Sequence, residues 1–173
     1  VAFDPVTGDF VKTFGGQGYA EGSSWTRGQG WALYGFVLSY IHTKNESYLN
    51  TAKRVANYFI ANMGPDALIP VDFRQPEECK LEDSTASAIA ACGMLEIEKY
   101  VPQNEKHVYH QAAIKLLRVL DEKRCSWDND CDNILEKCTG AFHDEKHEYS
   151  IIYGDYYFIE AIWKLTEQDI FIW

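Results

Sequence analysis

Two kinds of apolar segment alternate along the chain. Residues 28–41, 84–97 and 155–165 are apolar on nearly every side, whereas residues 48–63 and 107–122 carry one apolar stripe at helical spacing. A helix that is apolar all round is buried all round, and a helix with a single stripe covers it from outside. The alternation of inner and outer helices predicts an all-α fold of stacked helical hairpins, either a solenoid or a closed α/α barrel.

Polar turns precede the three all-apolar segments. Residues 23–27, 82–84 and 153–155 contain Ser, Thr or Asp, which commonly cap the N-termini of helices. If the inner helices run parallel, their N-termini emerge at one end of the fold. Free backbone N–H groups and positive dipole ends at that end favour an anionic ligand. The topology therefore predicts a binding site there. The residues before about 24 are rich in glycine and serine and predict a loop.

The size and charge of the chain restrict its class. The length of 173 residues predicts a single domain, residues 1–173, with a sizeable core. Sixteen Lys and Arg against 26 Asp and Glu give a net charge of −10, which argues against nucleic acid and against an anionic membrane surface. The sequence has no run of 18 apolar residues, so we expect no transmembrane helix. A hydrophobic content of 46% excludes a disordered chain.

The five cysteines do not follow a recognisable ligand spacing. Their odd number and the size of the core do not indicate a disulfide scaffold, although a disulfide between Cys125 and Cys131 or between Cys131 and Cys138 stays open. A metal cluster of Cys138, His143 and His147 is an alternative to solvated loop residues. We favour the loop interpretation and expect no metal and no cofactor.

Candidate ligand-binding residues gather before and within the first all-apolar segment. Trp25 and Trp31 offer aromatic faces on which the apolar side of a sugar ring can stack, and core packing is the alternative role for Trp31. Arg27 carries a planar fork that binds carboxylates in a bidentate manner, unless it serves as a surface or capping residue. Gln17 and Gln29 each provide a donor and an acceptor.

Glycosidic chemistry usually requires a carboxylic acid and a carboxylate. Asp83 and Asp155 stand at the starts of inner helices and are the weak candidates for catalytic residues, although the N-cap role explains either position. Asp72 fits a loop residue that bonds its own backbone. The sequence presents no obvious acid–base pair.

Four stretches together resemble one family. They read QGYA at residues 17–20, WTRGQGWALYG at 25–35, DSTASAIAA at 83–91 and YGDYYFIEA at 153–161. In this order they resemble glycoside hydrolase family 88, the unsaturated glucuronyl hydrolases. The resemblance implies an (α/α)6 barrel of six helical hairpins, which agrees with the alternation of inner and outer helices. A full barrel needs about twice this length, so the resemblance maps the chain onto the C-terminal half.

The resemblance also implies an activity and a site. Members of the family remove unsaturated uronic acid from the non-reducing end of lyase-generated oligosaccharides by hydration of the C4=C5 bond, with an Asp as the proton donor and without a metal. Matched to the family motifs, Gln17, Trp25, Arg27, Trp31 and Tyr153 would line the substrate pocket. The catalytic Asp of the family precedes the part represented here. We therefore expect these 173 residues alone to be inactive.

Alternative functions remain open at this stage. The chain could be a non-catalytic helical module that binds acidic sugars, an unsaturated rhamnogalacturonyl hydrolase of family 105, or a helical scaffold without a ligand. Half a barrel would expose the flanks of its inner helices, so we expect self-association through these edges. The chain begins with Val and shows no leader, from which we expect a processed chain or a fragment. Unpaired cysteines and the lack of a leader favour the cytoplasm.

Overall fold

The structure is a computed structural model that describes residues 1–166. It confirms the all-α prediction, because the described residues form five helices and one small hairpin. The elements are β1 (Ala2–Phe3), β2 (Phe10–Lys12), α1 (Thr26–Thr43), α2 (Glu46–Asn62), α3 (Ser84–Tyr100), α4 (Gln103–Lys123) and α5 (Ile152–Leu165). No helix among these residues is long and apolar enough to cross a membrane.

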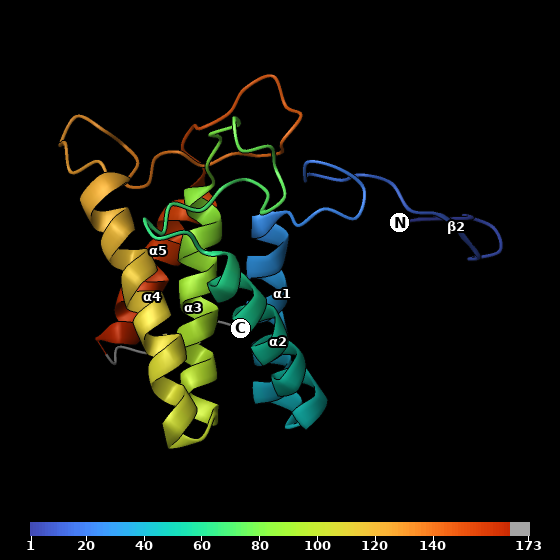
Figure 1. The fold of residues 1–173 in the computed structure, drawn as a ribbon, viewed down its shortest axis with the longest axis horizontal. Helices are drawn as coiled ribbons and strands as arrows, with labels where there is room; N and C mark the ends of the chain where they lie inside the picture. Colours follow the sequence, from blue (N-terminus) through green and yellow to red (C-terminus); the bar gives the residue numbers. More distant parts are fainter. Residues whose placement is uncertain (167–173) are drawn as a thin grey trace.

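Helix α3 lies at the centre of the helices (Figure 1). It packs against α1, α4 and α5, and its residues 84–97 are all buried. Helix α2 covers α1 with a stripe of Leu49, Ala52, Ala56 and Phe59, and α4 covers α3 with a similar stripe. The predicted division into inner helices α1, α3 and α5 and outer helices α2 and α4 is therefore confirmed for α2, α3 and α4.

Helices α1 and α5 differ from the expectation that every all-apolar segment is buried on all sides. Trp31 on α1 is 36% exposed, and Ile159 and Ile162 on α5 are 36% and 38% exposed. The physical reason is their position. Helix α1 packs between α2 and α3 and keeps one flank open, whereas α5 packs mainly on α3 within the described part of the chain.

The approach of α1 to α3 depends on Gly93. A Cβ atom at Gly93 would lie 2.1 Å from Leu33 Cδ1 and 3.0 Å from the Tyr34 Cα atom. The backbone of α1 can therefore approach α3 only because residue 93 has no side chain. This close approach helps to bury Leu33, Tyr34 and Val37 completely or almost completely.

The N-terminal ends of α1, α3 and α5 lie at the same end of the molecule, as the alternation predicted (Figure 1). Long loops cover this end. Residues 63–83 join α2 to α3 with short β-bridges such as Pro70 to Glu82, and residues 124–151 join α4 to α5 with a bridge from Cys138 to Tyr149. The loops supply most of the polar contacts around the helix starts.

The hairpin of β1 and β2 extends away from the helices as an arm (Figure 1). The sequence predicted only a loop here, because each strand is two or three residues long and gives too short a pattern to detect. Gly8, with a φ angle of 77°, lies in the turn, where its N–H donates to the Asp4 carbonyl at 2.9 Å. The rings of Phe3 and Phe10 meet edge to face at 6.4 Å.

Candidate carbohydrate-binding site

An aromatic patch forms where the first turns of α5 meet α1. We define the patch as Trp31, Tyr153, Tyr156 and Tyr157; together with Ile152 they line an apolar cleft of about 400 Å³. The ring of Trp31 lies 6.5 Å from that of Tyr153 and 5.3 Å from that of Tyr157, both in edge-on contact. Tyr153 is 48% exposed. The fold thus brings together two predicted ligand-binding residues that are 122 positions apart, and it leaves aromatic faces open to a sugar ring.

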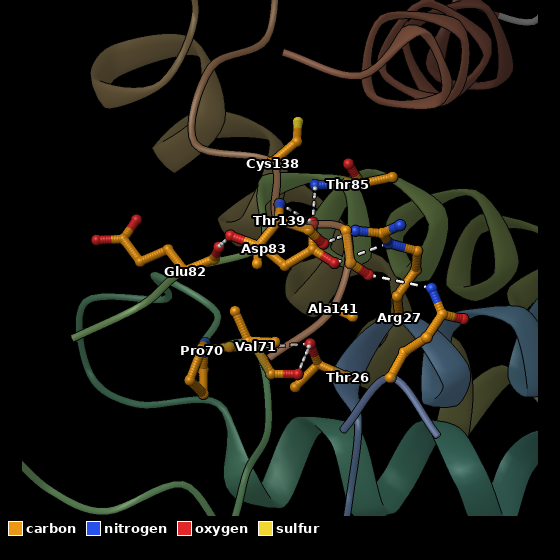
Figure 2. A network of polar contacts seen from close by, with 12 residues as sticks. Thr26, Arg27, Pro70, Val71, Glu82, Asp83, Thr85, Cys138, Thr139 and Ala141 are labelled. Atoms are coloured by element: carbon orange, nitrogen blue, oxygen red, sulfur yellow. Dashed lines mark hydrogen bonds and ion pairs between the residues drawn. The ribbon is translucent and has the colours of Figure 1, made fainter. Parts of the chain in front are cut away.

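The guanidinium group of Arg27, predicted to bind a carboxylate of the ligand, is directed into the protein. Its Nε atom lies 2.8 Å from Asp83 Oδ2, and its Nη2 group donates to the Thr139 carbonyl (Figure 2). Both side chains of the ion pair are almost completely buried. In this structure Arg27 therefore connects the start of α1 to the start of α3 and to the 124–151 loop. Its direct contact with a ligand stays a prediction.

Asp83 has several backbone partners. It caps α3 by accepting from the Thr85 N–H at 3.2 Å, and it accepts from the Thr139 N–H at 3.3 Å. Burial raises the pKa of Asp83 above its ordinary value, and the adjacent Arg27 guanidinium offsets this effect only in part. Thr139 also donates its hydroxyl to the Glu82 carbonyl at 2.7 Å, which fixes the loop against the helix start (Figure 2).

Asp155 lies in the first turn of α5 and binds the loop that precedes the helix. Its Oδ1 atom accepts from the N–H groups of Ile134 at 3.1 Å and Leu135 at 2.7 Å. Asp83 and Asp155, the two candidate acids, thus both hold backbone N–H groups in place. Their role as proton donors stays a prediction. In the structure each carboxylate accepts hydrogen bonds from the backbone.

Gln17 and the residues after it contact the 124–151 loop. The Gln17 side chain donates to the Gly140 carbonyl at 3.1 Å, and the Gln17 backbone carbonyl accepts from the Phe142 N–H at 2.9 Å. His143 Nε2 lies 2.8 Å from the Tyr19 carbonyl, and the rings of Tyr19 and Phe142 meet edge to face. These contacts attach the segment before α1 to the loop before α5.

Trp25 packs between Arg27 and the backbone of α1. The guanidinium carbon of Arg27 lies 5.6 Å from the centre of the Trp25 ring, within range of a cation–π contact. A Cβ atom at Gly28 would lie 2.8 Å from Trp25 Cε3, so this glycine makes room for the ring. Trp25 is only partly buried, but its indole N–H is enclosed without a partner among the described residues.

Asp72 makes more long-range contacts than a loop residue that bonds only its own backbone. The fully buried carboxylate accepts four hydrogen bonds: from the N–H groups of Tyr19 at 3.0 Å, Ser24 at 2.9 Å and Arg74 at 2.9 Å, and from the Ser23 hydroxyl at 2.6 Å. Only the bond to Arg74 is the local contact that the loop interpretation predicted. The other three hold the segment that leads into α1.

The cysteine and histidine residues do not gather around a common point. His147 Nε2 lies 3.0 Å from the Phe142 carbonyl, and all five cysteines are unpaired. Within residues 1–166 no group of three or more His, Cys, Asp or Glu side chains is arranged to hold a metal ion. The loop contacts described above account for His143 and His147.

Some site residues left no signal in the sequence. Thr139 and Phe142 lie in an irregular loop, where neither periodicity nor a motif marks them. Their partners, Arg27 and Gln17, are more than 110 positions away along the chain. For Asp72 the sequence predicts a loop residue that bonds its own backbone, but its long-range partners depend on the path of two loops.

Parallel inner helices, covering outer helices and an aromatic cleft at the helix starts define a protein built from α/α hairpins. No family model matches the chain. Among curated proteins, it is 35% identical to the unsaturated glucuronyl hydrolase of Bacillus sp. strain GL1, over 94% of this chain and 45% of the relative. It is 34% identical to the unsaturated chondroitin disaccharide hydrolase of Streptococcus pneumoniae, over 99% of this chain and 44% of the relative.

Solved structures agree with these relatives. The crystal structure of the Bacillus sp. GL1 unsaturated glucuronyl hydrolase matches with a TM-score of 0.87 and 34% identity, covering 96% of this chain and 45% of that one. A mutant of the Streptococcus agalactiae enzyme, complexed with dGlcA-GalNAc6S, matches with a TM-score of 0.87 and 32% identity, covering 99% and 47%. The resemblance to the unsaturated glucuronyl hydrolases of family 88 is therefore confirmed. The chain spans about 45% of the length of the curated relatives it matches, and its fold covers about half of their barrel.

Proposed function

We propose that the chain is the C-terminal portion, folded as a single domain, of a hydrolase that removes unsaturated uronic acid from the non-reducing end of lyase-generated oligosaccharides. The proposal is carried by the aromatic patch, which joins Trp31 and Tyr153 at the end where the inner helices begin. The names of the relatives support the substrate class, because they include an unsaturated glucuronyl hydrolase and an unsaturated chondroitin disaccharide hydrolase.

In this proposal the chain supplies the binding wall of the site. The indole of Trp31 stacks on the apolar side of the sugar, and Tyr153 encloses it from α5. We propose a substrate contact for the Gln17 amide as well, and the starts of α1 and α5 contribute positive dipole ends toward the uronate. Hydration of the C4=C5 bond needs a proton donor, and Asp83 and Asp155 are engaged with backbone groups. We therefore propose that the donor belongs to the part of the relatives that has no counterpart here.

Binding and turnover are tested separately. Titration of the folded chain with unsaturated chondroitin disaccharide, followed by tryptophan fluorescence, should show saturable binding that Trp31→Ala weakens about tenfold. Trp127→Ala is the matched control, because Trp127 is 63% exposed and packs on Phe158 away from the patch. Equal binding by both variants would overturn the role of the patch.

Turnover is followed through the ultraviolet absorbance of the C4=C5 bond. We expect no loss of absorbance when the 173-residue chain is added to the disaccharide, and loss once the preceding part of a relative is restored. Loss with the chain alone would show that it carries its own acid, and Asp83 and Asp155 would then be the first residues to substitute. An unsaturated rhamnogalacturonyl disaccharide, tested in parallel, distinguishes the family 105 alternative.

A non-catalytic module that binds acidic sugars is the second candidate function. The observation in its favour is that both candidate acids are committed to backbone contacts, whereas the aromatic patch is open. Binding without turnover, even after the rest of the barrel is restored, would support the module and exclude the hydrolase.

We also propose that the chain self-associates through the uncovered flanks of α1 and α5. Outside the aromatic patch, Ile159, Ile162 and Trp163 of α5 each expose more than a third of their surface, and apolar surface of this kind favours a partner. Two copies related by a two-fold axis would cover each other's flanks. Sedimentation at micromolar concentration should reveal a dimer, and a stable monomer would exclude this arrangement.

A cytoplasmic location is proposed as well. It is supported by five unpaired cysteines, because thiols persist in reducing compartments. Thiol titration of the protein isolated from its native source should find free thiols in the folded chain, whereas a disulfide would contradict this location.

A further inference from the structure

A cluster of ionisable side chains is buried beneath the aromatic patch, where the three inner helices meet. We define the polar cluster as Tyr34 of α1, Glu96 of α3, and Glu160 and Lys164 of α5. None of the four residues is more than 8% exposed. Neither the sequence motifs nor the proposed chemistry gives the cluster a task.

The contacts within the polar cluster join the helices in pairs. Lys164 Nζ lies 2.6 Å from Glu96 Oε1, which connects α5 to α3, and 3.4 Å from Glu160 Oε1. The Tyr34 hydroxyl donates to Glu160 Oε1, which connects α1 to α5 directly. Lys99 lies 3.2 Å from Glu96 at the edge of the cluster. Since α1 and α5 pack on different sides of α3, the bond from Tyr34 to Glu160 links two helices whose backbones barely touch.

Stability alone does not explain such a cluster. Buried ion pairs lose solvation, and apolar replacements of similar volume are often as stable or more stable. What a directed hydrogen bond adds is a fixed placement of one helix relative to another, which apolar contacts specify less strictly. Burial and the neighbouring Glu160 carboxyl raise the pKa of Tyr34, so the phenol keeps its proton and remains the donor.

The bond between Tyr34 and Glu160 lies one helical turn from the aromatic patch on both helices. Trp31 precedes Tyr34 by three residues on α1, and Tyr157 precedes Glu160 by three residues on α5. The centre of the Tyr157 ring lies 5.3 Å from that of Trp31 and 6.1 Å from that of Tyr34. Tyr157 therefore contacts both the aromatic patch and the polar cluster. A shift of α5 along or around its axis would therefore break the polar bond and separate Trp31 from Tyr153 and Tyr157 together.

We propose that Tyr34 and Glu160 are positioning residues that set the distance between the two walls of the aromatic patch. Their hydrogen bond holds α5 in the register that places Tyr153 and Tyr157 against Trp31. The consequence for ligand affinity rests on the proposed function, in which the patch binds a sugar ring. The positioning itself does not depend on that function and can be measured without a ligand.

The first test measures the geometry of the patch by NMR. In the wild-type chain, nuclear Overhauser contacts should connect the Trp31 indole with the rings of Tyr153 and Tyr157. Tyr34→Phe removes only the hydroxyl, and Glu160→Met removes the acceptor; both should weaken or abolish these contacts. Glu160→Gln keeps an oxygen acceptor and should restore them. If Glu160→Met does not fold, Tyr34→Phe decides the test, since it retains the ring.

Glu96→Gln is the matched control. It removes one charge from the same buried cluster and weakens the ion pair between Glu96 of α3 and Lys164 of α5. The hydrogen bond from Tyr34 to Glu160 stays intact. We expect it to lower stability without changing the contacts of Trp31. Unchanged contacts in Tyr34→Phe, or equal losses in Glu96→Gln, would overturn the proposal, because the cluster would then act only on general stability.

The second test measures affinity for unsaturated chondroitin disaccharide by tryptophan fluorescence. Tyr34→Phe and Glu160→Met should bind about two- to tenfold more weakly than wild type, and Glu160→Gln and Glu96→Gln should bind nearly as wild type does. If the wild-type chain binds no disaccharide, the proposed sugar-binding role fails, and the NMR contacts still decide the positioning role. Wild-type affinity in Tyr34→Phe would overturn the consequence for binding.

Discussion

Arg27 and Asp83, which are 56 positions apart, form a buried ion pair that joins the first turn of α1 to the N-cap of α3. Each partner also binds Thr139 of the loop before α5, the arginine through the carbonyl and the aspartate through the N–H. The starts of α1 and α3 are thereby tied to each other and to the loop that leads into α5. The pair supports the end of the fold at which the aromatic patch lies.

Substitution of Arg27 should therefore lower the stability of the fold strongly. Arg27→Met leaves the Asp83 carboxylate buried without its counter-charge, and we expect the free energy of unfolding to fall by about 3–5 kcal/mol. Urea denaturation measures the change. Arg124→Met is the control, because the Arg124–Glu82 pair is partly exposed and its loss should cost about 1 kcal/mol or less. Equal effects of the two substitutions would show that burial does not strengthen the role of Arg27.

The close approach of α1 to α3 at Gly93 gives a second prediction. Gly93→Ala forces a methyl group against Leu33 and the α1 backbone, so the free energy of unfolding should fall by about 1–3 kcal/mol. Gly35→Ala is the matched control within α1, because nothing lies within 4 Å of the added Cβ atom. It should raise the stability by up to about 1 kcal/mol through helix propensity. Opposite signs in thermal unfolding would confirm the packing argument, and a neutral Gly93→Ala would contradict it.

Asp72 should control the segment that leads into α1. Asp72→Ala leaves three buried or part-buried donors from residues 19–24 without this acceptor, and we expect a loss of about 3 kcal/mol in the free energy of unfolding. Asp66→Ala removes a single exposed contact with the Leu68 N–H and should change stability by less than about 0.5 kcal/mol. Chemical denaturation compares the two variants. A small effect at Asp72 would mean that the loops are held by other contacts.

The pKa of Cys125 predicts a pH dependence. Burial, and then the carboxylates of Asp121, Asp155 and Glu136, raise the pKa of the Cys125 thiol from an ordinary value of 9.0 to about 12. Between these two values the unfolded chain loses the thiol proton while the folded chain retains it, so stability falls as the pH rises from about 9 toward 12. Cys125→Ala should make the decline from pH 8 to pH 10 shallower in denaturation curves.

Alkylation provides the independent check on that thiol. Because the thiolate is the reactive form, folded Cys125 should react slowly with iodoacetamide at pH 8 and much faster in urea. Mass spectrometry after a short pulse of reagent resolves the two rates. Rapid labelling of the folded chain would contradict the raised pKa.

The sequence was sufficient for the parts of the fold that depend on local pattern. The apolar stripe of α2 and the all-round apolar character of α3 predicted an outer and a buried inner helix, because periodicity reports directly which faces need cover. The Asp83 cap followed from its residue type and position. For α1 and α5 the same reasoning was incomplete, since apolar residues such as Ile162 indicate that a face can be buried but not that a partner covers it.

The candidate site was only partly predictable for a different reason. Trp31 and Tyr153 were identified separately from motifs, but their contact depends on how α1 and α5 are placed around α3. The bonds of Arg27 to Thr139 and of Gln17 to Gly140 depend on the path of an irregular loop, which no residue pattern encodes. Long-range loop contacts of this kind became visible only in three dimensions.

The complete burial of α3 has a consequence for the exchange of backbone hydrogens with solvent. A helix surrounded by α1, α4 and α5 cannot open by itself, because its amides reach water only when its neighbours separate. The amides of residues 88–97 should therefore exchange deuterium only through unfolding of the whole chain, whereas those of the β1–β2 arm exchange almost at once. The slowest amides of α3 would then report the global stability of the protein in a single measurement, without denaturant.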